Sequence, residues 1–217
     1  MDNRIRVSIQ ELQEPGAYWK ELTNLGGLTD VHLIWPTVGG AYLADIGDAP
    51  DQEQVYDDMR EQWEKIAAQF VNALHKRSGG SLQLIGFHRP SRLQRLWSTF
   101  TTGFDPAPSC YVSPSAATSP EMISSCISHS FGRMMWTAVP EDQAIRRTRS
   151  MNPRDVRRML TDQTWWVAPG HEDPYLLAAT TDRQLLLSVV ANDLADVPVE
   201  FKTEPIGPQA LRKFMVY

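Results

Sequence analysis

Apolar residues recur along this chain at two spacings, and the clearest spacing is that of a helix. Between Asp51 and Arg77 the large apolar residues are three or four positions apart: Val55, Met59, Trp63, Ile66, Phe70 and Leu74. That spacing places them along one side of an α-helix whose opposite side is charged. Asp48 or Asp51 is expected to cap its start, and Gly79-Gly80 to end it. The pattern predicts a long amphipathic helix over about 51–77.

Shorter apolar segments on both sides of this helix predict strands. Residues 31–35 and 41–44 are separated by Pro36 to Gly40, which predicts a hairpin, and residues 81–87 follow the helix. Residues 3–11 alternate between polar and apolar, so we expect them to add an edge strand. The resulting β-β-α-β order predicts an α+β fold, with the long helix packed on an antiparallel or mixed sheet.

The second half of the chain has a weaker pattern. Ser119-Pro120 and Asn152-Pro153 each combine a capping residue with a proline at the first helical position, which predicts shorter helices from there to Gly132 and to Leu160. Strands are predicted at 133–139 and 199–202, and a last short helix at 208–214.

A stretch rich in Pro, Ser and Ala, residues 103–119, is the best candidate for a boundary within the chain. Pro106, Pro108 and Pro114 are expected to prevent regular structure there. We therefore expect a β-β-α-β lobe over 1–103, a connector over 104–118 and an α+β lobe over 119–217, or else one single domain over 1–217.

Composition and cysteine usage narrow the class of protein. The chain has 217 residues, of which 42% are hydrophobic and 22% charged, as is usual for a globular protein that buries a core. It has no run of about 18 apolar residues and no apolar N-terminal leader, so we expect neither a membrane span nor export. Cys110 and Cys126 are therefore expected to be reduced thiols in a soluble, cytoplasmic protein.

The net charge of −5 is distributed in blocks. Between Ala41 and Glu64 there are eight acidic residues against Arg60 alone, whereas residues 146–158 hold six arginines against Asp155. A general nucleic-acid binder would carry a basic excess over the whole domain, so we expect no nucleic-acid partner. The blocks fit an acidic face that meets a basic partner, although an acidic helix face is also often simply solvated.

Candidate catalytic chemistry is sparse. The five histidines are scattered, and no phosphate-binding loop or nucleophile motif is present. Only His171-Glu172-Asp173 groups residues suited to a metal or to acid–base work, and neighbouring residues point in different directions. We expect no catalytic residue, no metal and no cofactor. The alternative is a small hydrolase or transferase that uses His171 and Glu172.

Two adjacent tryptophans lead into this polar stretch. On a strand, Trp165 and Trp166 must face opposite sides of the sheet. Either helices cover both sides, or one tryptophan is exposed as an aromatic anchor beside Glu172 and Asp173. The residues from His171 to Tyr175 are then the polar tip between apolar strands.

The pattern Trp166-x-x-Pro169-x-x-Glu172-Asp173-Pro174-x-Leu176, followed by Thr181-Asp182-Arg183-Gln184-Leu185-Leu186, covers about the last quarter of the chain. It is similar to C-terminal hairpins of immunity proteins from bacterial polymorphic and type VI secretion toxin systems. The resemblance implies a non-catalytic protein that binds one cognate toxin and blocks its active site or its access to substrate. Many such toxins are nucleases with basic clefts, which would give the acidic faces a use.

We therefore predict two partner-binding surfaces. One is the acidic helix face, with Asp57, Asp58, Glu61 and Glu64, and the other is Trp166 with the loop residues His171, Glu172, Asp173 and Tyr175. The expected partner is the toxin protein, with no membrane involved. A scaffold or adaptor subunit without a toxin partner is a further alternative.

Overall fold

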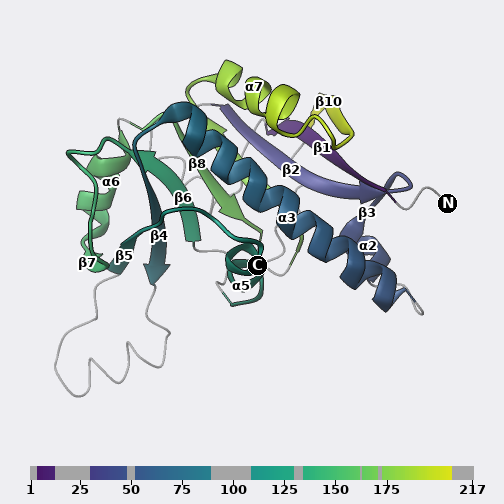
Figure 1. Ribbon diagram of the computed structural model, residues 1–217, viewed down its shortest axis with the longest axis horizontal. Helices are drawn as coiled ribbons and strands as arrows, with labels where there is room; N and C mark the ends of the chain where they lie inside the picture. Colours follow the sequence, from purple (N-terminus) through teal and green to yellow (C-terminus); the bar gives the residue numbers. More distant parts are fainter. Residues whose placement is uncertain are drawn as a thin grey trace.

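The computed structural model describes residues 4–12, 30–47, 52–88, 109–129, 134–161, 163–170 and 173–206 (Figure 1). The elements follow the chain as β1 (Ile5–Leu12), β2 (Asp30–Val38), β3 (Ala41–Tyr42), α2 (Leu43–Gly47), α3 (Glu53–Ser78), β4 (Ser81–His88), β5 (Ser109–Pro114), α5 (Pro120–His129), β6 (Met134–Val139), β7 (Arg149–Met151), α6 (Pro153–Thr161), β8 (Trp165–Pro169), β9 (Leu176–Thr180), α7 (Arg183–Asp193) and β10 (Val199–Ile206).

All described strands join one sheet in the order β10-β1-β2-β9-β8-β6-β4-β5-β7, with β3 paired to β2. The pair β1–β10 is parallel and the other described pairs are antiparallel, so the sheet is mixed. The predicted α+β fold is confirmed. The sheet mixes strands from the two predicted lobes: β2 and β4, from residues 1–103, pair with β9 and β6, from residues 119–217. The two predicted lobes thus contribute to the same sheet.

The long helix is confirmed as α3, Glu53–Ser78. Its apolar stripe is buried against the sheet, with Trp63 fully buried and Phe70 and Leu74 nearly so. The helix ends as predicted at Gly79, whose φ of +72° suits a residue without a Cβ and whose N–H donates to the His75 carbonyl. At the other end Gln52 occupies the N-cap position without a side-chain bond, and Asp48 and Asp51 lie outside the described residues.

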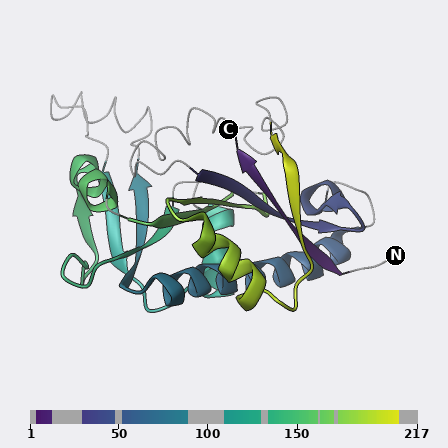
Figure 2. The same ribbon diagram turned by 90° about the horizontal axis from the view of Figure 1, so that it is seen from above.

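Helices cover both faces of the sheet. Figure 2 shows α3 and α7 on one face and α6 on the other. Trp165 therefore packs with Trp63 in the core beneath α3, while Trp166 packs with Val156 of α6 in the second core. Both tryptophans are 1% exposed, so the alternative of an exposed tryptophan anchor is wrong.

Three strand predictions need correction. β2 continues through Pro36, which the sequence placed in the hairpin turn; the turn consists of Gly39 and Gly40, with φ of +60° and +90°. On one side of β2, the pairing with β9 stops at Ile34 and the pairing with β3 starts at Thr37. Pro36 lies in the gap between them. A proline is tolerated there because no neighbouring strand requires a hydrogen bond from its backbone nitrogen. The first strand, β1, is not an edge strand, because it lies between β10 and β2.

The third correction concerns the proline-rich stretch. Residues Ser109–Pro114 form β5, a strand between β4 and β7, so the expectation of no regular structure there is wrong. The strand ends at Pro114, where the missing N–H costs least, while Cys110 and Val112 are buried in the second core.

The smaller elements of the second half follow the sequence prediction closely. Ser119 caps α5 through its Oγ, which accepts from the Met122 N–H at 3.3 Å, and Asn152 caps α6 in the same way toward Arg154 at 2.8 Å. β6 and β10 lie where strands were predicted. Residues 183–186, the end of the segment that resembles C-terminal hairpins, belong instead to α7, where the N-cap Asp182 accepts from the N–H groups of Gln184 and Leu185. The predicted helix at 208–214 lies outside the described residues.

Candidate partner-binding site

The first half of α3 carries the exposed acidic residues that the sequence singled out. Asp57, Asp58 and Glu61 are exposed, as is Glu53 in the first turn. They lie opposite the apolar stripe because residues three or four apart share a side of the helix. Three of the four predicted acidic residues, Asp57, Asp58 and Glu61, are therefore on the surface.

The contacts of these acidic residues stay within the helix. Asp58 accepts a hydrogen bond from Gln54 at 2.9 Å, and Glu61 pairs with Lys65 at 2.7 Å. Glu53 and Asp57 form no hydrogen bond or ion pair within the part of the chain that the structure describes. None of these carboxylates holds α3 to another element that the structure describes.

Glu64 does not belong to this surface, so its predicted role as an exposed contact is wrong. It is 8% exposed and pairs with Arg60 at 3.1 Å, one turn earlier. Its position, directly after the fully buried Trp63, puts it at the border of the face that packs on the sheet. The Arg60 guanidinium supplies the counter-charge that a buried carboxylate needs.

The described residues on the two sides of the tip between β8 and β9, Gly170 and 173–175, are joined by backbone hydrogen bonds. The Gly170 N–H donates to the Tyr175 carbonyl at 2.7 Å, and the Tyr175 N–H donates to the Asp173 carbonyl at 2.9 Å. A Cβ on residue 170 would lie 2.5 Å from the Asp173 carbonyl oxygen and 2.6 Å from the Tyr175 ring. Only glycine fits there, so Gly170 fixes the shape of the tip.

The Asp173 carboxylate at this tip acts electrostatically on a residue near the start of α3, which links the two predicted surfaces. Burial raises the pKa of Tyr42 far above its ordinary value, and the negative charge of Asp173 raises it further. Burial also raises the pKa of Tyr56 on α3, to which Asp173 and Asp57 both add. One carboxylate of the tip thus acts on phenols from β3 and α3. The hydroxyls remain protonated donors at neutral pH.

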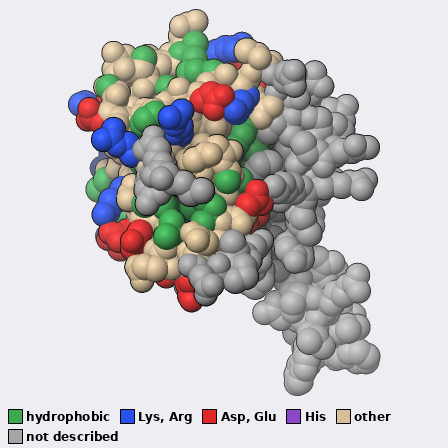
Figure 3. All heavy atoms as spheres, turned by 90° about the vertical axis from the view of Figure 1, so that its right-hand side faces the viewer, with side chains coloured by type: hydrophobic (Ala, Val, Ile, Leu, Met, Phe, Trp, Pro, Cys, Tyr) green, Lys and Arg blue, Asp and Glu red, His purple; other side chains and the backbone are tan. Residues whose placement is uncertain are grey.

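Charges at this end of the molecule are mixed. Figure 3 views the side that lies at the right in Figure 1, where α2 and the start of α3 are found, and both acidic and basic side chains appear on its described surface. The acidic side chains therefore form separate patches. Such a surface suits a partner with matching local charges better than a uniform polycation.

The arginine block lies at the far end. β7 and α6 occupy the left side of Figure 1, opposite α2 along the longest axis. Arg149 and Arg158 line a groove of about 350 Å³ there, over Met151 and Met159. These arginines are too distant to neutralise the carboxylates at the start of α3.

Several predicted contact residues are not accessible or cannot be placed. Tyr175 is 2% exposed and Trp166 is 1% exposed, so neither presents a surface to a partner. Both belong to the second core, since the hairpin is covered on both faces. Asp173 is partly buried. His171 and Glu172 lie outside the described residues, and with them the alternative catalytic pair.

Sequence reasoning missed the residues that support the tip. Tyr42 was placed only in a strand, and Tyr56 falls between the apolar positions of the helical stripe. Gly47 packs so closely on Tyr56 that a Cβ would lie 2.8 Å from the ring. No local pattern signals this cluster, because it joins residues more than a hundred positions apart.

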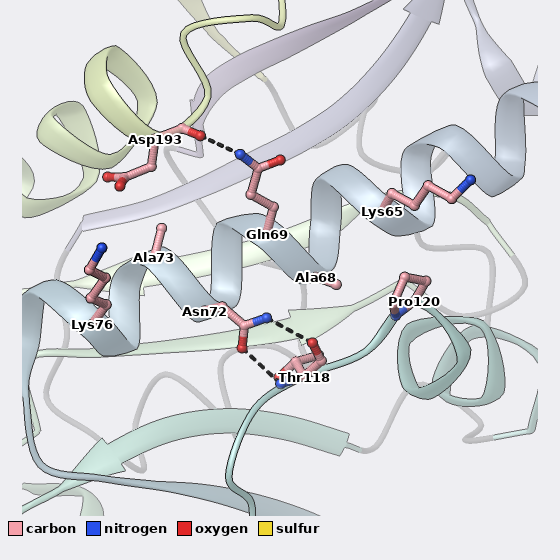
Figure 4. Close-up of a pocket in the computed structure, with 9 residues that line it drawn as sticks. All are labelled: Lys65, Ala68, Gln69, Asn72, Ala73, Lys76, Thr118, Pro120 and Asp193. Carbon is pink, nitrogen blue, oxygen red and sulfur yellow. Dashed lines mark hydrogen bonds between the residues drawn. The ribbon is translucent and has the colours of Figure 1, made fainter.

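The second half of α3 differs from the first in how its polar side chains are used. Figure 4 shows Asn72 directed to Thr118 and Gln69 directed to Asp193, across a groove of about 460 Å³. The Asn72 amide both donates to the Thr118 carbonyl and accepts from its N–H, each at 2.8 Å. Arg77 forms an ion pair with Asp193, and Ser78 accepts from Trp165 Nε1 at 2.8 Å. These groups tie α3 to its neighbours, so the groove is better explained as structural than as a ligand site.

Two further titratable groups among the described residues are buried. Burial raises the pKa of the Cys110 thiol to about 11, so this thiol stays protonated and unreactive. Burial likewise lowers the pKa of His32, which is 5% exposed. Among these residues no three His, Cys, Asp or Glu side chains gather as a metal site would require, and no helix is long and apolar enough to cross a membrane.

Comparison with known proteins gives no further guidance. No protein-family model, curated protein or solved structure matches the chain.

Proposed function

We propose that this chain is a non-catalytic binding protein that recognises a basic protein partner through the start of α3 and the adjoining β8–β9 tip. The partner would be a bacterial toxin, and the chain its immunity protein, which blocks the toxin's active site or its access to substrate. In this proposal the protein acts in the cytoplasm.

One observation carries the proposal: among the residues that the structure describes, the exposed carboxylates of the first half of α3 bond within their own helix, whereas polar groups of its second half bond to other elements. Asp57 and Asp58 are exposed and link α3 to no other described element. Exposed carboxylates without a structural task are available to a partner. A positive cleft would be attracted to them, which speeds encounter and disfavours wrong partners.

The support under this surface favours binding over flexibility. Two backbone hydrogen bonds join the described residues at the sides of the tip, and α3 is anchored in the core by Met59, Trp63, Phe70 and Leu74. A rigid surface loses little conformational entropy on binding, which strengthens the complex. The mixed charges of this end would restrict binding to a partner of complementary pattern.

Co-expression in bacteria with the product of a neighbouring toxin-like reading frame tests this function. The wild-type chain should restore growth and co-purify with the toxin. The variant Asp57→Lys/Asp58→Lys should fold normally but lose protection, because two attractive contacts become repulsive.

The matched control is Glu141→Lys/Asp142→Lys, which makes the same change in charge on another exposed turn. It should protect as the wild type does. If the wild type neither protects nor forms a complex, the immunity proposal is wrong. If both double variants fail equally, net charge rather than the α3 surface governs binding.

A further inference from the structure

β10 is an edge strand with an unusual exposed surface. It lies at the end of the sheet beside β1, and residues 200–203 are all exposed. Phe201 is 47% exposed and is one of two large apolar side chains so exposed among the described residues. Exposed edges offer unpaired backbone groups to another strand.

Among the residues that the structure describes, the pairing with β1 determines which backbone groups of β10 have no partner strand. Val7 pairs with Val199, and the Val7 N–H donates to the Pro198 carbonyl at 2.9 Å. Residues along a strand direct their N–H and C=O groups alternately to the two sides. Glu200 and Lys202 therefore turn their backbone groups toward β1, while Val199 and Phe201 turn theirs outward.

A second copy of β10 matches these outward groups in one antiparallel register. If Phe201 lies opposite Phe201 of the other copy, the two residues exchange both of their backbone hydrogen bonds across a two-fold axis. Val199 then faces Thr203 of the other copy. The two exposed phenylalanine side chains lie on the same face, next to each other, and cover one another from water.

The charges of β10 fit the same register. Glu200 and Lys202 flank Phe201 and already pair within the strand at 2.6 Å. With Phe201 at the centre, each Glu200 lies opposite Lys202 of the other copy, in the closer type of cross-strand pair. A shift by two residues would place like charges opposite each other or leave them unmatched. The strand is thus complementary to itself in this register.

We propose that two copies of this chain associate through antiparallel pairing of β10, centred on Phe201, to form a two-fold dimer with a continuous sheet. The β1–β10 register becomes irregular between Gln10 and Leu12, beyond Lys202, which limits the paired length. An interface of one short strand pair is far below the roughly 1,600 Å² of a stable complex, so dissociation constants on the order of 100 µM are expected. The proposal is independent of the toxin-binding surface.

A charge-swap cycle tests this register. Sedimentation of the full chain over a concentration series up to about 1 mM should show a mass approaching twice that of the chain. Glu200→Lys and Lys202→Glu should each weaken dimerisation by about tenfold or more, since two opposite-charge pairs become like-charge pairs. The double variant Glu200→Lys/Lys202→Glu should restore wild-type affinity. Asp57→Lys/Asp58→Lys should leave the dimer unchanged.

Amide exchange followed by NMR gives a second readout that needs no substitution. The amides of Val199 and Phe201 should gain protection as concentration rises, while those of Glu200 and Lys202 should stay constant. A chain that is monomeric at 1 mM would overturn the proposal. So would a dimer that is indifferent to both single charge changes, or one whose Val199 and Phe201 amides gain no protection.

Discussion

The two halves of α3 share one helix and one buried stripe but use their polar side chains differently. In the second half, Asn72 bonds to Thr118 and Arg77 pairs with Asp193, so polar groups connect the helix to the rest of the fold. In the first half, the bonds of Asp58 and Glu61 within the described residues go to Gln54 and Lys65 of the same helix. The contrast separates polar groups that stabilise the protein from polar groups that remain available to a partner.

The largest expected difference in stability is between substitutions of two side-chain amides of α3, Asn72 and Gln54. Asn72→Ala should lower the free energy of unfolding by about 2–3 kcal/mol, because the Thr118 N–H and C=O each lose a partner in a partly buried position. Gln54→Ala, which removes only an exposed bond to Asp58, should cost about 0.5 kcal/mol or less. Urea unfolding measures both. Equal losses would remove the distinction between the halves.

The buried Tyr42 phenol on β3 predicts that the stability of the protein depends on alkaline pH. Because burial raises the folded-state pKa of Tyr42, the unfolded chain loses this proton near pH 10 while the folded protein keeps it. The contribution of Tyr42 to the free energy of unfolding is therefore complete below pH 10. It decreases by about 1.4 kcal/mol for each pH unit above pH 10. Urea unfolding of Tyr42→Phe between pH 9 and 11 should show a shallower decline than the wild type. Parallel declines would mean that this phenol ionises freely in the folded state.

A smaller effect separates the ion pairs of the two halves. Arg77→Ala should cost about 1 kcal/mol, since Arg77 and Asp193 are only 33% and 23% exposed and join α3 to α7. Lys65→Ala removes a pair whose members are 61% and 67% exposed, and should cost about 0.5 kcal/mol or less. Thermal unfolding at low and high salt would check the order. A Lys65→Ala variant that is less stable than Arg77→Ala would contradict the difference between the two halves of α3.

The smallest expected effect on stability belongs to the proposed binding residues themselves. Asp57→Lys/Asp58→Lys should change the free energy of unfolding by no more than about 0.5 kcal/mol, because surface charges distant from other elements contribute little. Chemical denaturation provides the measurement. A loss above about 2 kcal/mol would show that these carboxylates have a structural task.

Local periodicity was enough to predict α3, because six apolar residues at helical spacing leave no alternative structure that buries them. The starts of α5 and α6 were also predictable, because a capping residue followed by proline is a local signal of a helix start. β5 was missed because the prediction considered how many prolines the stretch contains and not where they lie. Pro114 is at the end of the strand, where the loss of a backbone N–H destabilises the sheet little. The sequence could not decide how the two sides of Trp165-Trp166 are covered, since that depends on where α3 and α6 pack.

The candidate site was predicted in part. Exposure of Asp57 and Asp58 follows from their helical phase, whereas burial of Glu64 depends on the breadth of the face that packs on the sheet. The approach of the β8–β9 tip to Tyr42 and Tyr56 depends on strand order, which no local pattern contains.

The most direct test of the central claim is calorimetric titration of a toxin that co-purifies with the wild-type chain, using the wild-type chain and Asp57→Lys/Asp58→Lys. The account predicts that the double variant binds at least about a hundredfold more weakly, and that raising the salt concentration weakens the wild-type complex much more than the variant complex. Equal affinity of the two chains, with the same dependence on salt, would contradict it.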